Sequence, residues 1–502
     1  MSDLRRESAA PLEPYFDRTP QPFGDGPSDP LVYDASPRML RQRTVNFAAK
    51  RLADMRYVSG LDRATAERHF RWRPAVPPGG LGFRAVPDGQ AALVAAQRRG
   101  DIIVDMDDAD RRTIVRWNDA EFGEPVVGAA VARRGYGGMV AGPHASLRFD
   151  PQAVSHCRLE PGRAWPFGDA VETPPALPAD LGRALDAFFA RSAGAYGVLI
   201  ATPERILCER YGEFGAADRA TPSWSMTKAI TCTVIGRLIQ EGWLASVHDP
   251  APAPLWRDPR ATHRLITLDH LLRMRSGLAF PVSHGDGHVT LGFENSAVYQ
   301  DAVDAFDAAQ RSIVATVSSA VFRYINSGLN VIGAIVRDQI ERRGLPYCET
   351  LYGLLVDRLG MASYQHSADI AGNLIASGAG FATLRDYAKL GVLYLQNGMW
   401  GGERSHFGLH AAGQGAGQPA PLVQAARAVT SRPQQQRRPE PCGGGVETRS
   451  AASAIASSRS PTLANWRPTA PVIHADVRIK PAVSLPKASS AQPATSLTRI
   501  RT

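Results

Sequence analysis

The chain changes character after Arg404, and this break limits how much of it can form a packed core. Residues 405–502 are rich in Ala, Ser, Pro, Gly and Arg, and their large aromatic side chains are Phe407 and Trp466. Such a segment buries too little apolar surface to offset its backbone entropy, about 1–2 kcal/mol per residue. We therefore expect residues 405–502 to be a disordered basic tail and the folded body to lie before them.

The net positive charge lies in the same tail. The chain has 57 Lys and Arg against 48 Asp and Glu, and residues 405–502 hold 12 and 3 of these. The tail therefore carries the whole net charge of +9, and residues 1–404 are neutral overall. Because a neutral body does not attract phosphate, we expect no nucleic-acid partner.

The chain lacks membrane and export signals. A membrane-spanning helix needs about 18 uninterrupted apolar residues, and no stretch approaches this. The N-terminus runs into polar, proline-rich sequence without the apolar core of a signal peptide. We expect no membrane partner and a cytoplasmic location. Five cysteines without a Cys-x-x-Cys pair are consistent with reduced structural thiols there.

Composition divides the remaining chain into three parts. Residues 1–38 are polar and rich in proline, which predicts an irregular N-terminal segment. Residues 39–170 have globular composition and form an N-terminal extension. Within it, apolar spacing predicts helices over residues 40–57 and 64–72, and strands at 102–104 and 113–115. A proline-rich linker at 166–178 leads into a second domain, residues 171–404.

The second domain opens with a helix, a hairpin and a second helix. We expect Asp180 to cap a helix through Arg191, followed by strands at residues 197–200 and 205–208 around a turn. A further helix begins near Ser225, has dense apolar spacing and ends at Gly242. This order predicts an α+β fold with a sheet covered by helices.

The start of that further helix carries Ser225 and Lys228. Residues three apart on a helix share a face, so the amine can reach the hydroxyl. A serine hydroxyl is a weak nucleophile until a neighbouring group accepts its proton, and the positive end of the helix dipole favours its anion. Ser-x-x-Lys is a weak signal by itself, since an ordinary capping serine gives the same pattern.

Further motifs make the pattern specific. Together with Ser-Met-Thr-Lys (225–228), the chain resembles the serine β-lactamase and penicillin-binding-protein superfamily, near the class C β-lactamases, 6-aminohexanoate-dimer hydrolases and carboxylesterases. The other motifs follow in that family's order: Ile-Thr-Leu-Asp-His-Leu-Leu (266–272) with Ser-Gly-Leu (276–278), Tyr-Ile-Asn (324–326), and Ala-Ser-Gly-Ala-Gly-Phe-Ala-Thr (376–383). The last of these resembles the family's Gly-rich strand that leads into a helix, and we expect Thr383 to cap that helix. The resemblance covers residues 178–404. It implies a β-lactamase/transpeptidase-like antiparallel sheet flanked by helices.

Tyr324 and Asn326 complete the candidate catalytic set with Ser225 and Lys228. A cation beside Tyr324 favours its phenolate, which could take the serine proton and return one to the leaving group. We place Tyr324 ahead of Lys228 as this base and keep both open. Asn326 can orient Lys228 or a substrate amide, and it can also cap the helix that follows.

No metal or organic cofactor is expected. Residues 284–288 (His-Gly-Asp-Gly-His) have two histidines but no nearby third ligand, so we interpret them as an active-site loop. In 6-aminohexanoate-dimer hydrolases the comparable loop closes over substrate through a tyrosine, and Tyr299 is a loose candidate for this role. Residues 135–138 (Gly-Tyr-Gly-Gly) lack the strand-to-helix context of a nucleotide site.

The resemblance breaks at the C-terminus. The family has a late strand with Lys-Thr-Gly or His-Thr-Gly, which supplies one of the two N–H donors of the oxyanion hole, the other being that of Ser225. No such triplet follows Arg404. Losing one donor typically costs about 10²–10³ in turnover. A reading-frame shift near residues 404–406 would explain the break, and a native interaction tail is the alternative.

We therefore predict an α+β serine hydrolase, incomplete at its C-terminus, that acts on small amides or esters through an acyl-enzyme. The alternative is a catalytically impaired remnant or binding protein of the same fold. The sequence does not indicate the substrate or the oligomeric state.

Overall fold

The computed structural model describes most of the chain between residues 36 and 404 and one short strand beyond it. The structural statements below concern these residues: 36–70, 96–118, 123–141, 147, 149, 151, 154, 159–192, 194–258, 261–279, 299–301, 304–404 and 472–475.

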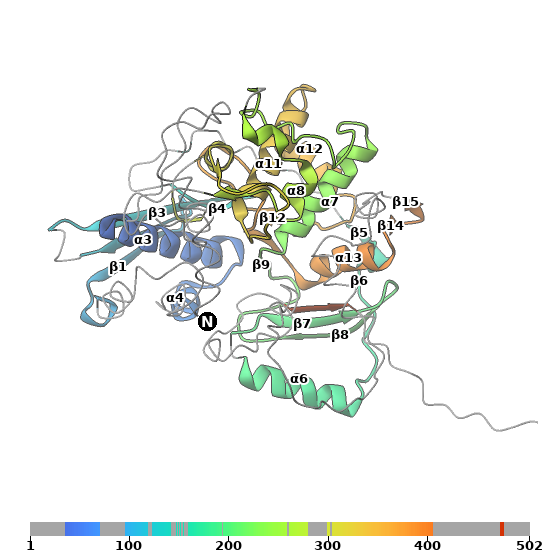
Figure 1. Cartoon of the computed structure of the whole chain (residues 1–502). Coiled ribbons are helices and arrows are strands. Elements are labelled where there is room, and N and C mark those ends of the chain that lie inside the picture. Colours follow the sequence, from blue (N-terminus) through green and yellow to red (C-terminus); the bar gives the residue numbers. More distant parts are fainter. Residues whose placement is uncertain are drawn as a thin grey trace, which may run out of the picture.

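Helices and strands are both spread along the chain (Figure 1). The helices are α3 (Pro37–Ala53) with a π-helical turn (Asp54–Val58), α4 (Arg63–His69), α6 (Ala179–Arg191), α7 (Thr227–Gln240), a 3-10 turn (Thr262–Leu265), α8 (Leu268–Leu272), α10 (Ala305–Gln310), α11 (Asn326–Glu341), α12 (Tyr347–Leu354) and α13 (Leu384–Leu395). The strands are β1 (Ile102–Asp107), β2 (Arg112–Trp117), β3 (Val126–Arg133), β4 (Gly137–Val140), β5 (Glu160–Ala164), β6 (Gly168–Ala170), β7 (Gly197–Ala201), β8 (Ile206–Tyr211), β9 (Thr221–Trp224), β10 (Leu278–Ala279), β11 (Ile313–Val314), β12 (Gln365–His366), β13 (Gly380–Ala382), β14 (Met399–Trp400), β15 (Glu403–Arg404) and β16 (Val472–Ala475).

Helix α3 packs on a four-stranded antiparallel sheet with the order β1-β2-β3-β4. Apolar side chains that include Val45, Leu52 and Trp117 fill the space between them. The approach is close because Gly128 in β3 has no side chain. A Cβ atom there would lie 2.4 Å from the carbonyl carbon of Val45. The helix backbone therefore rests directly on the sheet.

A second sheet, β16-β7-β8, separates α6 from α13 (Figure 1). Successive side chains of a strand point to opposite faces. Val198 and Ile200 of β7 accordingly pack with Leu185 of α6, whereas Leu199 belongs to the main core together with Leu384 of α13. The result is a helix–sheet–helix sandwich, as the α+β expectation requires.

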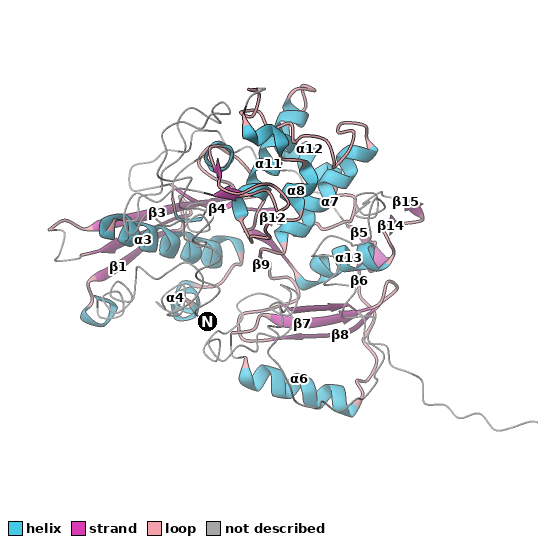
Figure 2. Ribbon diagram, in the orientation of Figure 1, coloured by secondary structure: helices cyan, strands magenta, loops and turns pink. Residues whose placement is uncertain are grey.

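Helices α7, α8, α11 and α12 pack with α13 in the main core (Figure 2). A small sheet with the order β12-β13-β9 lies at the start of α7. Tyr136, Met139 and Trp165, from the segment predicted as an N-terminal extension, are buried in this same core. The described part of that segment is therefore continuous with the core that carries α7.

Most elements expected from apolar periodicity are present at nearly the expected bounds. The prediction that Asp180 caps α6 is wrong, because α6 begins at Ala179 and Asp180 lies inside its first turn without a capping hydrogen bond. The short strands β9 to β12, β14 and β15 were not anticipated. Residues 135–138 span the end of the turn and the start of β4 in the β3–β4 hairpin, a strand-to-strand connection and not a strand-to-helix one.

The expected disordered tail falls almost wholly outside the described residues. Its described part, β16, departs from that expectation, because Val472–Ala475 pairs in parallel with β7 from Val198 to Ala201. The pairing also differs from the antiparallel arrangement expected for the sheet, and it gives the backbone groups along this edge of β7 a partner.

The length and apolar character of a helix decide whether it can cross a bilayer, and this applies to the described helices. None of them combines the length and the apolar character needed to cross a membrane.

Candidate active site

Ser225 lies in the turn between β9 and α7. Strand β9 ends at Trp224, which has a positive φ of 47°. A non-glycine residue in this left-handed conformation typically costs about 1–3 kcal/mol and is kept by the structure around it. Helix α7 begins at Thr227, two residues after Ser225, and the amide of Lys228 donates to the carbonyl of Ser225 at 3.1 Å. The hydroxyl is thus held at the positive end of a 14-residue helix.

The amine of Lys228 is buried and contacts three oxygen atoms. The side chain is 1% exposed. Its Nζ lies 3.2 Å from Ser225 Oγ and 2.7 Å from Asn326 Oδ1, and it also donates to the carbonyl of Ser377. A buried amine needs such partners because its charged form is otherwise costly to remove from water. The arrangement holds the nitrogen against the serine hydroxyl.

Asn326 approaches the amine from the first turn of α11. The residue is buried, and its neighbour Ile325 occupies the N-cap position in an extended conformation. The expectation that Asn326 caps this helix is therefore wrong. The expected contact with Lys228 is present, since the amide oxygen accepts from the amine.

Tyr324 lies on the outer side of the lysine. Its ring centroid is 5.0 Å from Lys228 Nζ, within the range of a cation–π contact, and 37% of the residue is exposed. The structure thus brings Tyr324 together with Lys228, Ser225 and Asn326. Among the described residues, the hydroxyl of Ser225 is bonded by the amine and not by Tyr324.

Ser377 and Tyr299 extend the site, and sequence reasoning gave Ser377 no role. The Ser377 amide donates to Asn330 Oδ1 at 3.2 Å. The Ser377 hydroxyl lies 3.3 Å from the hydroxyl of Tyr299, whose ring packs edge-on against Trp224. The signal for Ser377 was its place in the Gly-rich segment 376–383. The sequence could not reveal the contact with Lys228, because that contact uses the backbone carbonyl, which every residue type has.

The first turn of α7 is fixed to β13 through Thr227. Its Oγ1 accepts from the amide of Gly380 at 2.9 Å and lies 2.9 Å from the hydroxyl of Ser223. Gly380 allows this approach, because a Cβ atom there would lie 2.8 Å from Thr227 Oγ1. Residues 376–383 do form the expected strand leading into a helix, with Thr383 as its cap.

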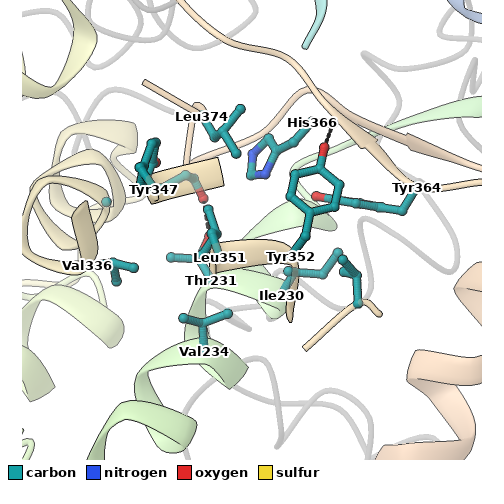
Figure 3. A pocket seen from close by; sticks show the side chains of 13 residues that line it. Ile230, Thr231, Val234, Val336, Tyr347, Leu351, Tyr352, Tyr364, His366 and Leu374 are labelled. Carbon is teal, nitrogen blue, oxygen red and sulfur yellow. Dashed lines mark hydrogen bonds between the residues drawn. The ribbon is translucent and has the colours of Figure 1, made fainter. Parts of the chain in front are cut away.

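A small cavity lies behind α7, between this helix and helices α11 and α12 (Figure 3). It offers about 30 Å³, enough for a water molecule. Tyr352, Tyr364 and His366 point into it (Figure 3). Burial lowers the pKa of His366 to about 4 and raises the pKa of Tyr364. Because no candidate catalytic residue lines it, this cavity is not the substrate site.

The described residues contain no group of three or more His, Cys, Asp or Glu side chains placed to hold a metal ion. The predicted loop at residues 284–288 lies outside them. Cys208, Cys232 and Cys348 are free, buried thiols. Burial raises the pKa of Cys232 to about 12 and that of Cys348 to about 11, which makes both poor nucleophiles.

Known proteins resemble the chain over part of its length. The family model described as Beta-lactamase matches residues 198–449. Among solved structures, the chain is similar to three bacterial proteins. They are a protein from Bacillus anthracis provisionally named a 6-aminohexanoate-dimer hydrolase (18% identity, 54% of this chain and 70% of that one, TM-score 0.40), a provisionally named β-lactamase from Bacteroides dorei (19%, 45% and 66%, 0.35) and a penicillin-binding-protein homologue from Caulobacter crescentus (18%, 46% and 74%, 0.34).

A comparison with curated proteins finds no relative. The structural similarities are distant, so the family model carries the assignment. Because that model matches half of the chain and spans Ser225, Lys228, Tyr324 and Asn326, the chain belongs to the β-lactamase family and has its α+β, β-lactamase/transpeptidase-like fold.

Proposed function

We propose that the protein is a serine hydrolase that cleaves small amides or esters through an acyl-enzyme on Ser225. The observation that carries the proposal is the buried amine of Lys228, 3.2 Å from Ser225 Oγ and 2.7 Å from Asn326 Oδ1. An amine beside a serine is the arrangement that activates a nucleophile.

The hydrogen bonds suggest how the proton moves. Asn326 Oδ1 and the carbonyl of Ser377 are acceptors, so a neutral amine donates its two N–H groups to them. Its lone pair then faces Ser225 and can accept the hydroxyl proton. This geometry favours Lys228 over Tyr324 as the base, contrary to the order preferred from the sequence. Tyr324 is our candidate for passing the proton to the leaving group, and the position of its ring 5.0 Å from the same amine supports this.

The chemistry then balances in two halves. Ser225 Oγ bonds to the substrate carbonyl carbon while its proton passes to Lys228. The tetrahedral intermediate breaks its bond to the amine or alcohol, which leaves with that proton. Water next adds to the carbonyl carbon of the acyl group and gives one proton to the amine of Lys228. Ser225 leaves with this proton, and a carboxylic acid is released. A positioned base of this kind typically contributes about 10²–10⁴-fold.

Fluorophosphonate labelling tests the proposal. We expect the wild-type protein to be labelled, Ser225→Ala to remain unlabelled and Lys228→Met to react at least about 100-fold more slowly, by loss of the base. Ser318→Ala is the matched control. Its hydroxyl is also half-buried, and it donates to the carbonyl of Ser276 at 3.1 Å without touching an amine. Equal labelling of folded wild type and Ser225→Ala would refute the assignment.

One sequence observation favours a second candidate, a binding protein of the same fold. No Lys-Thr-Gly or His-Thr-Gly triplet follows Arg404, so a donor of the oxyanion hole has no counterpart there. The binding protein predicts folded wild type that neither reacts with fluorophosphonate nor turns over p-nitrophenyl esters or nitrocefin. A hydrolase with one donor predicts labelling, with turnover lower by about 10²–10³.

A further inference from the structure

Helix α3 carries a stripe of buried polar side chains. Arg43, Asn46, Lys50 and Asp54 recur every three or four residues, so they share one face of the helix and its π-helical continuation. Each is at most 4% exposed. Buried polar groups of this kind require specific partners. The partners of this stripe lie far away in the sequence.

The first two side chains hold the residues that follow Tyr299. Arg43 makes a two-point ion pair with Asp301, at 2.7 Å from Nε and 3.0 Å from one terminal nitrogen. Asn46 Nδ2 donates to the carbonyl of Gln300 at 2.7 Å. Both the backbone and the side chain of this short segment are therefore tied to α3.

Tyr299 connects this segment to the lysine. Its hydroxyl lies 3.3 Å from that of Ser377, the residue whose carbonyl accepts from Lys228. The fit is tight, because a Cβ atom on Gly378 would lie 2.1 Å from the Tyr299 hydroxyl oxygen. A shift of Tyr299 would thus act on the turn before β13, whose Ser377 carbonyl holds the amine.

The same helix also packs against the residue before the nucleophile. The ring of Phe47 lies 5.8 Å from that of Trp224, and the guanidinium of Arg51 lies 5.1 Å from the same ring. The ring of Tyr299 packs against the same Trp224 ring, with 5.7 Å between their centroids. Trp224 has the left-handed conformation that sets the direction of the chain at Ser225. Its packing partners keep that conformation in place.

The C-terminal part of α3 is held through Lys50, which belongs to the same stripe. Lys50 donates to the carbonyl of Gly138 at 2.6 Å and to the hydroxyl of Ser367 at 3.1 Å, and it pairs with Asp54. With the close contact at Gly128, these bonds seat α3 between its own sheet and the β12-β13-β9 sheet. The helix is a rigid support with one face toward the candidate active site.

We infer that α3, which lies outside the family-matched residues 198–449, is a positioning element of the active site. Arg43 acts through Asp301 and Tyr299, and Arg51 acts through Trp224. The inference rests on the proposed hydrolase function. It assigns a role to the segment before residue 170, which the sequence left without one.

The test breaks the Arg43–Asp301 clamp and measures the rate of Ser225 labelling. We expect Arg43→Gln and Asp301→Asn each to lower the labelling rate constant at least tenfold. The double variant should be no slower than either single variant, because both changes remove the same clamp. Arg43→Lys keeps the charge but loses the two-point geometry, and should recover part of the rate.

Arg56→Gln is the matched control. Arg56 makes the same two-point contact with Asp108, at 3.1 and 2.7 Å, in the same part of the chain but on its surface. Its labelling rate should stay within twofold of wild type. A folded Arg43→Gln variant that is labelled at the wild-type rate would overturn the inference. So would rate losses of the two single variants that multiply in the double variant.

Amide hydrogen exchange separates this inference from the proposed function. In Arg43→Gln, exchange should rise in peptides covering residues 223–230 and 299–301, and it should be unchanged in Arg56→Gln. If wild type is not labelled at all, the hydrolase proposal fails, and exchange still decides whether α3 holds these segments. Unchanged exchange in Arg43→Gln would show that it does not.

Discussion

Residue His366 should make the stability of the protein depend on pH. Its ring is buried beside the cavity behind α7, and Nε2 lies 2.7 Å from the carbonyl oxygen of Ile375. Burial lowers the pKa of His366 from 6.5 to about 4. The folded protein therefore binds a proton at this site less readily than the unfolded chain does. Its contribution to stability is complete above pH 6.5 and is lost as the pH falls toward 4.

The size of the effect follows from the two pKa values. Lowering the pH from 7.5 to 5.0 protonates most of the unfolded His366 but little of the folded one. The difference corresponds to a loss of about 2 kcal/mol in the free energy of unfolding. Urea unfolding of wild type and His366→Gln at both pH values measures it. The glutamine is neutral throughout and can still donate a hydrogen bond, so the variant should lose about 2 kcal/mol less than wild type.

Asp369 provides an internal check. Burial raises the pKa of this carboxyl to about 6, so its own contribution runs in the opposite direction and favours the folded state as the pH falls through 6. Both proteins contain Asp369, so its effect cancels in the difference between them. Equal losses for wild type and His366→Gln would refute the assignment of a neutral, buried imidazole at 366.

Two further predictions concern the site and its surroundings. Asn326→Ala should slow fluorophosphonate labelling of Ser225 about 10- to 100-fold, because the amide oxygen stabilises the charge that the Lys228 amine gains with the serine proton, and a hydrogen bond to a charged group is worth about 1.5–3 kcal/mol. Asn373→Ala, which removes a buried asparagine bonded to Asp369 instead, should leave the rate of the folded fraction unchanged. Cys232, with its pKa raised to about 12 by burial, should resist iodoacetamide at pH 8 in the native protein and react in urea. Peptide mass spectrometry checks this, and rapid native alkylation would contradict it.

Local sequence patterns predicted the elements whose burial follows a simple period. Strands β7 and β8 were anticipated as short apolar runs on either side of a turn, and helix α7 from its dense apolar spacing. Strands of two to four residues, such as β9 and β13, are too short for any period to appear. They form because the chain on either side brings them together, which is a property of tertiary structure.

The candidate site was predictable in its side chains and not in its backbone. Ser225 and Lys228 share a helical face, so their contact followed from spacing. The carbonyl of Ser377 could not be predicted, because every residue has one. The capping role of Asn326 failed for a related reason. An asparagine before a helical pattern is a good cap in general, but here the helix begins at Asn326 itself and its amide serves the lysine.

The clamp on α3 also has a kinetic consequence. Arg43 and Asp301 are separated by 258 positions in the chain, and Lys50 and Ser367 by 317. Contacts between such distant residues require a large loop to close first, which slows folding. During synthesis the ribosome releases α3 long before its partners exist, so its polar stripe must stay hydrated until the remaining core arrives. The seating of this helix should therefore be a late folding step, and refolded protein should recover labelling of Ser225 more slowly than it recovers helical circular dichroism.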